Sequence, residues 1–195
     1  MRQLILHMSV SLDGYVAHSD GNIDWLTPRG EGAVDHGDRR HRANLEMFGE
    51  IGLIAMGRRA CEQMAPAWSS SDSPMAQVIN ALPKVIYSQT LEEVDWDNTR
   101  ISRAAITDEI PKLKAEGGKD IVVFGGGHFG HSLIRERLAD ELRLTVHPVA
   151  LGDGISLFHG LPEPQRFELV SSTVYADGCV SQVLRPGRAG RARSG

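Results

Sequence analysis

Short runs rich in Ile, Val and Leu recur along the chain and alternate with segments that carry apolar residues at helical spacing. Several runs are apolar on both faces, which is typical of strands that a parallel sheet buries between two layers of helices. The runs that predict such strands are Leu4–Val10, Ile51–Met56, Val85–Tyr87 and Ile121–Phe124.

The segments between these strands predict amphipathic helices. Ser73-Pro74 places a capping residue before a proline, which is a favoured way to begin a helix, and Gly117-Gly118 is a typical helix end. The predicted helices are Asp38–Glu50, Arg58–Met64, Ser73–Leu82, Asp108–Glu116 and Phe129–Leu138.

The last third of the chain has a different pattern. Glu141–Val149, Arg166–Tyr175 and Cys179–Leu184 are strand-like, and Ala176-Asp177-Gly178 separates the last two. An Asp-Gly pair between two such runs predicts a β-hairpin. The pattern therefore predicts an α/β fold with a mostly parallel central sheet, an antiparallel C-terminal hairpin and helices on both faces.

The 195 residues fit one domain, and their formal net charge of −4 is unevenly distributed. Residues 1–184 carry 17 basic and 25 acidic side chains, a net charge of −8, whereas four arginines lie in the last eleven residues. We expect residues 1–185 to form the domain and residues 186–195 a disordered basic tail. An acidic body lacks the clustered Lys and Arg of a nucleic-acid surface, so we expect no nucleic-acid partner, although the tail leaves binding to RNA open.

The apolar runs are too short to span a bilayer or to form a secretory signal, so no membrane partner is expected. Cys61 and Cys179 cannot build a disulfide scaffold, and no CxxC pair or HExxH motif is present, so no metal is expected. A reduced, cytoplasmic protein is the expectation.

Three strand ends carry residues suited to phosphate. Met56-Gly57-Arg58-Arg59 turns a predicted strand into a helix, whose N-terminal N–H groups favour an anion, and arginines add donors for a phosphate. A pair of solvated basic residues is the alternative. Ser88 and Gln89 follow another strand, where they either form a simple loop or contact a nucleotide.

The third strand end is Gly125-Gly126-Gly127-His128-Phe129-Gly130, which matches G-x-G-x-x-G between a strand and a helix. The following strand does not end in an acid, so the pattern predicts a pyrophosphate-binding turn outside a Rossmann domain. Glycines that allow close packing of helix and sheet are the alternative.

Five motifs follow the predicted strands in a fixed order. They are Ser11-Leu12-Asp13-Gly14-Tyr15-Val16-Ala17, Met56-Gly57-Arg58-Arg59, Val85-Ile86-Tyr87-Ser88-Gln89, Val122-Val123-Phe124-Gly125-Gly126-Gly127, and Glu141–Pro148 with Leu151-Gly152-Asp153-Gly154. This order resembles the dihydrofolate reductase-like superfamily. It is most similar to the branch named for the C-terminal reductase domain of the riboflavin-biosynthesis deaminase/reductase.

The resemblance implies the three-layer dihydrofolate reductase-like fold, an NADPH-dependent reductase and, by analogy, a homodimer. It implies that NADPH contacts an extended set of residues: Met8, Val16, Ala17, Gly57, Arg58, Arg59, Ser88, Gln89, Gly126, Gly127, His128 and Phe129. The resemblance also implies that Asp13, Trp25 and Thr145 lie beside the substrate.

Reduction also requires a proton, for which Asp38 is the candidate and His41 the rival. A capping or solvated carboxylate is the alternative for Asp38, and a turn residue the alternative for Asp13. The expected function is hydride transfer from NADPH to a C=N or C=O bond of a flat, pterin- or pyrimidine-like small molecule. The alternatives are the riboflavin-pathway reductase of 5-amino-6-(5-phosphoribosylamino)uracil and an NADPH-binding module without catalysis.

Overall fold

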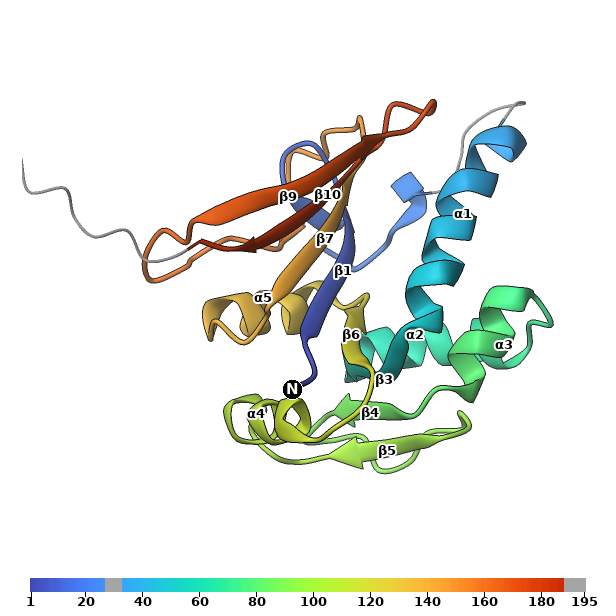
Figure 1. The fold of residues 1–195 in the computed structure, drawn as a ribbon, viewed down its shortest axis with the longest axis vertical. Helices are drawn as coiled ribbons and strands as arrows, with labels where there is room; N and C mark the ends of the chain where they lie inside the picture. The colour runs from blue at the N-terminus through green and yellow to red at the C-terminus, as the bar shows by residue number, and fades with distance from the viewer. Residues whose placement is uncertain (27–32, 188–195) are drawn as a thin grey trace, which may run out of the picture.

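The computed structural model describes residues 1–26 and 33–187, with the backbone alone for residues 33–38 (Figure 1). The strands are β1 (Leu4–Val10), β2 (Tyr15–Ala17), β3 (Ile51–Gly57), β4 (Lys84–Tyr87), β5 (Thr99–Ser102), β6 (Asp120–Phe124), β7 (Glu141–Val146), β8 (Ile155–Ser156), β9 (Phe167–Val174) and β10 (Val180–Pro186). The helices are α1 (Ala33–Gly49), α2 (Arg58–Ser69), α3 (Pro74–Ala81), α4 (Ile106–Ala115) and α5 (Gly127–Arg135), and η1 (Asp24–Leu26) is a 3-10 turn.

Eight of these strands form one sheet in the order β5-β4-β3-β6-β1-β7-β10-β9. The strands from β5 to β7 are parallel to their neighbours, whereas β10 runs antiparallel to both β7 and β9. The predicted parallel sheet with an antiparallel C-terminal hairpin is confirmed. β10 continues to Pro186, and the Gly187 N–H donates to the carbonyl of Arg166. The expected domain boundary at residue 185 stays a prediction. The rest of the predicted tail, residues 188–195, lies outside the described residues.

Helices cover the two faces of the sheet, as the buried runs predict (Figure 1). One core joins α4 and α5 to β1, β3, β6 and β7, with Leu6, Val123 and Leu133 fully buried. The other core joins α1, α2 and α3 to the opposite face, with Ile54 and Ile79 fully buried. Burial on both faces is the reason that the central strands lack alternation of apolar and polar residues.

The start of α3 agrees with its sequence signal. The hydroxyl of Ser73 accepts a hydrogen bond from the Ala76 N–H, and Pro74 occupies the first helical turn. α2 extends beyond the predicted Met64 to Ser69 and accommodates Pro66. The proline removes one internal N–H donor without ending the helix, so the predicted end was wrong.

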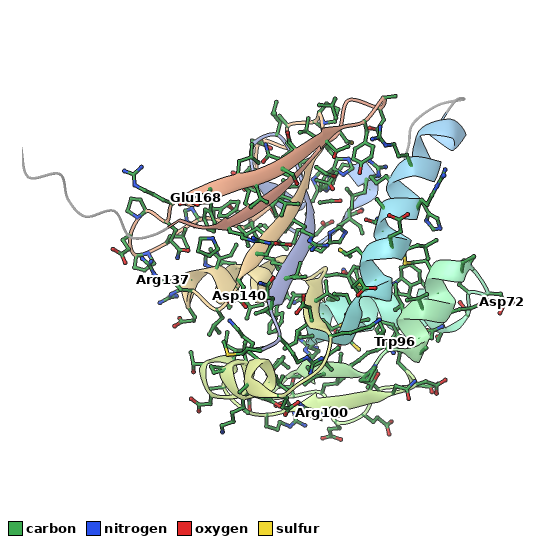
Figure 2. All side chains as sticks on the ribbon, viewed as in Figure 1. Asp72, Trp96, Arg100, Arg137, Asp140 and Glu168 are labelled. Carbon is green, nitrogen blue, oxygen red and sulfur yellow. The ribbon has the colours of Figure 1, made fainter. Side chains whose placement is uncertain are left out.

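Three strands were not predicted. β5 runs beside β4 with Ile101 paired to Ile86, and β2 pairs with β8 in a separate two-stranded sheet. The predicted strand β9 lies at the outer edge of the main sheet, where Glu168 points away from the core (Figure 2). The short β2–β8 sheet is the one that shapes the candidate site.

Candidate functional site

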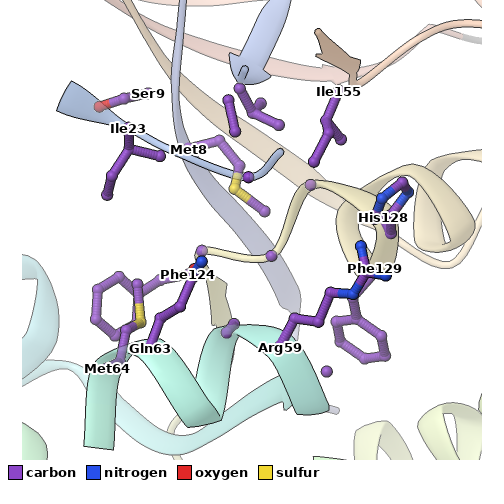
Figure 3. Close-up of a pocket in the computed structure, with 18 of the residues that line it drawn as sticks. Met8, Ser9, Ile23, Arg59, Gln63, Met64, Phe124, His128, Phe129 and Ile155 are labelled. Atoms are coloured by element: carbon purple, nitrogen blue, oxygen red, sulfur yellow. The ribbon is translucent and has the colours of Figure 1, made fainter. Parts of the chain in front are cut away.

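A cavity of about 850 Å³ lies where β1, β3 and β6 end (Figure 3). In open parallel sheets this edge is the usual place for a ligand. All the predicted cofactor residues except Ser88 and Gln89 line it. The fold therefore brings together residues that lie in four separate segments of the chain.

Two helices begin at this cavity, and neither has a side-chain cap. α2 starts after Gly57 and α5 starts after Gly126, so the first N–H groups of both helices lack a side-chain acceptor. Exposed N–H groups and the helix dipole make each N-terminus favourable for an anion. Two such ends on one cavity are suited to a ligand with more than one phosphate.

The glycine run allows α5 to start against the cavity wall. Gly126 has φ +80°, a left-handed conformation that favours glycine. A Cβ on Gly127 would lie 2.2 Å from Val16 Cγ2 and 2.8 Å from Ile155 Cγ2. The β2–β8 sheet therefore packs directly on the start of α5, and a Cβ at position 127 would require Val16 and Ile155 to shift.

The two arginines at the start of α2 differ in their contacts. Arg58 Nη1 donates to Glu62 Oε1 at 3.0 Å. Arg59 is exposed and has no hydrogen bond or ion pair with the described residues. Its side chain extends along the cavity toward His128 (Figure 3). Arg59 is thus the cation available to a phosphate, whereas Arg58 is partly neutralised.

Apolar residues form the middle of the cavity. Met8, Val16, Ala17 and Ile155 line it, and Ala17 pairs with Ile155 across β2 and β8. This wall can accept the flat face of a ring and exclude water from it.

The far end of the cavity carries several neutral polar side chains. Ser9 and Ile23 lie opposite Arg59 and His128 (Figure 3), and His7 and Asn44 also line the cavity. The His7 Nδ1 atom is buried and has no hydrogen-bond partner. Burial, assisted by the positive charge of Arg143, lowers the pKa of His7 to about 4, so the ring is neutral at neutral pH.

Ser88 and Gln89 do not line the cavity. The Ser88 hydroxyl accepts from the N–H groups of Thr90 and Leu91, and Gln89 Nε2 donates to the carbonyl of Arg103. These contacts tie the end of β4 to the segment after β5. Both residues have the contacts of loop residues, and their contact with a nucleotide stays a prediction.

Asp13 also has contacts of a turn residue. Its carboxylate accepts from the Ser11 hydroxyl at 2.6 Å and from the N–H groups of Leu151 and Gly152. These donors, with Ser11 the strongest, lower the pKa of Asp13 to about 2. Asp13 is outside the cavity lining and ties the β1–β2 turn to the loop before β8.

Trp25 and Thr145 lie near the polar end, behind its lining. Trp25 packs edge-on against His147 with ring centroids 5.3 Å apart, and its buried Nε1 has no partner. Thr145 Oγ1 lies 2.8 Å from Ser181 Oγ. Neither side chain is part of the cavity lining.

The two predicted proton donors lie on α1. The side chain of Asp38 is outside the described residues. His41 is exposed and does not line the cavity, whereas Asn44, one turn further along α1, does. Within the described residues, no group of three His, Cys, Asp or Glu side chains is placed to hold a metal ion.

Sequence reasoning missed His7, Ser9 and Asn44. His7 and Ser9 belong to an apolar strand, where isolated polar residues give little signal on their own. They line the cavity because the order of the strands places the end of β1 there. Two polar residues spaced by two along β1 could have indicated one shared face.

The family model for the RibD C-terminal domain matches residues 2–181. The chain belongs to this family. The protein YwjB of Bacillus subtilis is 31% identical to this RibD C-terminal domain over 172 residues, which are 86% of this chain and 89% of that protein.

Solved structures agree with this assignment. A putative riboflavin biosynthesis protein from Shewanella sp. PV-4 matches with a TM-score of 0.73 and 27% identity, over 95% of this chain and 99% of that one. Dihydrofolate reductase from Enterococcus faecalis, solved with NADP(H), matches with a TM-score of 0.61 and 13% identity, over 95% of this chain and 96% of the other. This RibD C-terminal domain therefore has the predicted dihydrofolate reductase-like fold.

Membership of the RibD C-terminal domain family supports a reductase-type role. No described helix of this RibD C-terminal domain is both long and apolar enough to cross a membrane. The fold and the family are therefore established, and the cavity supplies the argument about chemistry.

Proposed function

We propose that the protein is an NADPH-dependent reductase that transfers hydride to a C=N or C=O bond of a flat, pterin- or pyrimidine-like heterocycle. The observation that carries this proposal is the pair of uncapped helix N-termini, α2 and α5, on one cavity with Arg59 between them. This arrangement suits the phosphates of a dinucleotide better than it suits a ligand with one charged group.

The residues present fit such a cofactor. The first N–H groups of α5 and the closely packed Gly127 would hold the pyrophosphate. Arg59 would hold the 2′-phosphate, with a smaller contribution from Arg58, which Glu62 partly neutralises. Met8 and Val16 would pack against the nicotinamide and exclude water. When bound, NADPH supplies the hydride, and the chain supplies the position and the dry wall.

The polar end of the cavity supports an uncharged heterocycle as substrate. His7, Ser9 and Asn44 are neutral groups that can donate or accept hydrogen bonds along the edge of a ring. The free arginine of the cavity, Arg59, lies at the opposite end (Figure 3). This separation supports a cofactor site at one end and a flat, neutral substrate at the other.

Loss of NADPH absorbance in the presence of a panel of acceptors tests this function. The panel contains 7,8-dihydropterins, aminouracils with and without a ribosyl phosphate, and simple quinones. We expect steady oxidation with at least one uncharged heterocycle. Binding of NADPH without oxidation by any acceptor would instead support the non-catalytic module.

A further inference from the structure

A serine and a histidine connect the polar end of the cavity to a buried group of side chains behind it. Ser9 on β1 lines the cavity, and its Oγ atom lies 3.2 Å from Nε2 of His147. His147 directly follows β7, the strand that pairs with β1. The imidazole is therefore one hydroxyl away from any ligand at that end.

The His147 ring is held on its other sides. Nδ1 lies 3.3 Å from Cys179 Sγ, and Trp25 packs edge-on against the ring. Cys179 is buried, and this burial raises the pKa of its thiol, so it stays protonated at neutral pH. Both ring nitrogens thus have defined partners, one of which faces the cavity.

The charged groups near His147 come from α1 and from the β9–β10 turn. Arg40 on α1 pairs with Asp177 in the turn at 2.9 Å. Burial lowers the pKa of His147 below its usual value, Arg40 lowers it further, and Asp177 partly opposes this. The ring therefore binds and releases its proton on the acidic side of neutrality.

The other titratable groups of the described cavity lining, the arginines apart, are less suited to proton delivery. His128 lies at the opposite end of the cavity, near Arg59 (Figure 3). Glu62 pairs with Arg58, and Asp20 accepts a hydrogen bond from the Asn22 N–H. Glu62 belongs to α2, and Asp20 belongs to the segment between β2 and η1. The Nδ1 atom of His7 is buried and has no hydrogen-bond partner among the described residues.

We propose that Ser9 and His147 form a proton relay that delivers a proton to the ring nitrogen or oxygen of the substrate during its reduction. This inference rests on the proposed function. Ser9 is the group that touches substrate, and His147 acts through it as a positioning and proton-holding residue.

The step balances in atoms and electrons. As the hydride of NADPH forms a new C–H bond, the electron pair of the C=N or C=O bond moves onto the nitrogen or oxygen. That atom takes the proton of the Ser9 hydroxyl, and Ser9 takes the Nε2 proton of the His147 imidazolium. NADPH leaves as NADP⁺, and His147 is left neutral until it regains a proton from solvent.

Two variants and one matched control test the relay. His147→Gln keeps a group that can hydrogen-bond to Ser9, and Ser9→Ala removes the hydroxyl. Ser181→Ala is the control, because Ser181 lies on the same face of the sheet, bonds only to Thr145 among the described residues, and is not in the cavity lining. The measured quantities are kcat against pH with NADPH and a 7,8-dihydropterin, KM for NADPH, and the NMR titration of the His147 ring with NADP⁺ bound.

We expect wild-type kcat to fall as pH rises through the midpoint of the His147 NMR titration. Both relay variants should lose this dependence and have about 100-fold lower kcat below the midpoint, with an unchanged KM for NADPH. Ser181→Ala should behave as wild type.

A His147→Gln variant that keeps the wild-type pH profile would overturn the relay while leaving the reductase function intact. An NMR midpoint unrelated to the kinetic midpoint would also overturn it. If none of the acceptors in the panel supports NADPH oxidation by the wild-type protein, the proposed function itself fails, and the relay fails with it.

Discussion

Arg58 and Arg59 are neighbours in sequence, yet only Arg59 is free to meet an anion in the cavity. Arg58 forms an i, i+4 ion pair with Glu62, whereas Arg59 has no ion pair or hydrogen bond with the described residues and extends toward His128 (Figure 3). We expect Arg59→Ala to weaken NADPH binding by about 10- to 100-fold and NADH binding much less, because a charge-assisted pair to phosphate contributes about 1.5–3 kcal/mol. Fluorescence titration with both cofactors measures the difference.

Arg58→Ala serves as the matched control for this substitution. Its effect on NADPH binding should be smaller, since Glu62 already neutralises part of its charge. Equal loss of NADPH and NADH affinity in Arg59→Ala would contradict the assignment of the 2′-phosphate to this side chain.

His7 links the substrate end of the cavity to the stability of the fold. Its pKa is lowered to about 4 in the folded protein, so the unfolded chain binds more protons between pH 4 and 6.5. Stability is therefore lost as pH falls through this window, by about 2 kcal/mol between pH 7 and pH 5. Urea unfolding at the two pH values measures this loss.

His7→Leu should remove that part of the acid sensitivity and should not destabilise the protein at pH 7, because it removes a buried nitrogen without a partner. The same variant should raise KM for the acceptor and leave KM for NADPH unchanged. An unchanged KM for the acceptor would show that His7 is not part of the substrate site.

At the scale of single elements, β4 depends on a buried lysine. Lys84 is 1% exposed, and its ammonium donates to the carbonyls of Asn80, Leu82 and Asp97 while lying over the ring of Trp96. These contacts join the end of α3 to the start of β4 and to the segment before β5, where Trp96 is labelled in Figure 2. The lysine therefore fixes the strand that follows α3.

Lys84→Met should lower the free energy of unfolding by about 2–4 kcal/mol, because the three carbonyls lose a charged donor. Urea unfolding measures the change, and exposed Lys112 on α4 provides the control substitution, Lys112→Met. A loss in the Lys84 variant no larger than that of the control would contradict the structural role of this ammonium group.

The sequence predicts the elements that are buried on both faces and misses those that are short or paired at long range. β1, β3 and β6 are predominantly apolar on both faces, and Ser73 with Pro74 fixes the start of α3. β5 has the sequence Thr-Arg-Ile-Ser, with one apolar residue, so no periodicity marks it. β2 and β8 have three and two residues and exist only because distant segments meet.

The same limit applies to the site. The glycine run and the arginines after β3 were identifiable because each is a local strand–turn–helix signal. Ser88 and Gln89 carry a similar local pattern, but the Ser88 hydroxyl accepts from the Leu91 N–H and Gln89 donates to the carbonyl of Arg103 after β5. The contact between Ser9 and His147 spans 138 positions, so no local pattern could indicate it.

At the scale of the whole molecule, two helix layers cover most of the sheet, and the antiparallel hairpin extends from it (Figure 1). β9 at the sheet edge exposes Leu169, Val170 and Val174. The homodimer that the family resemblance implies remains a prediction, as does the single domain boundary near residue 185.

The cavity lies between the β2–β8 sheet and the starts of α2 and α5. At Gly127 the start of α5 packs against Val16 of β2 and Ile155 of β8. The most direct measurement of NADPH binding there is isothermal titration calorimetry of the wild type, Gly127→Ala and Gly117→Ala with NADPH. Gly117 is the matched control, because a Cβ there meets no atom within 4 Å.

We predict that the wild type and Gly117→Ala bind NADPH with the same affinity. Gly127→Ala should bind at least about tenfold more weakly, a loss of about 1.4 kcal/mol, because the added methyl group displaces Val16 and Ile155 from the start of α5. Failure of the wild type to bind NADPH, or unchanged binding by a folded Gly127→Ala variant, would contradict the assignment of this cavity to the cofactor.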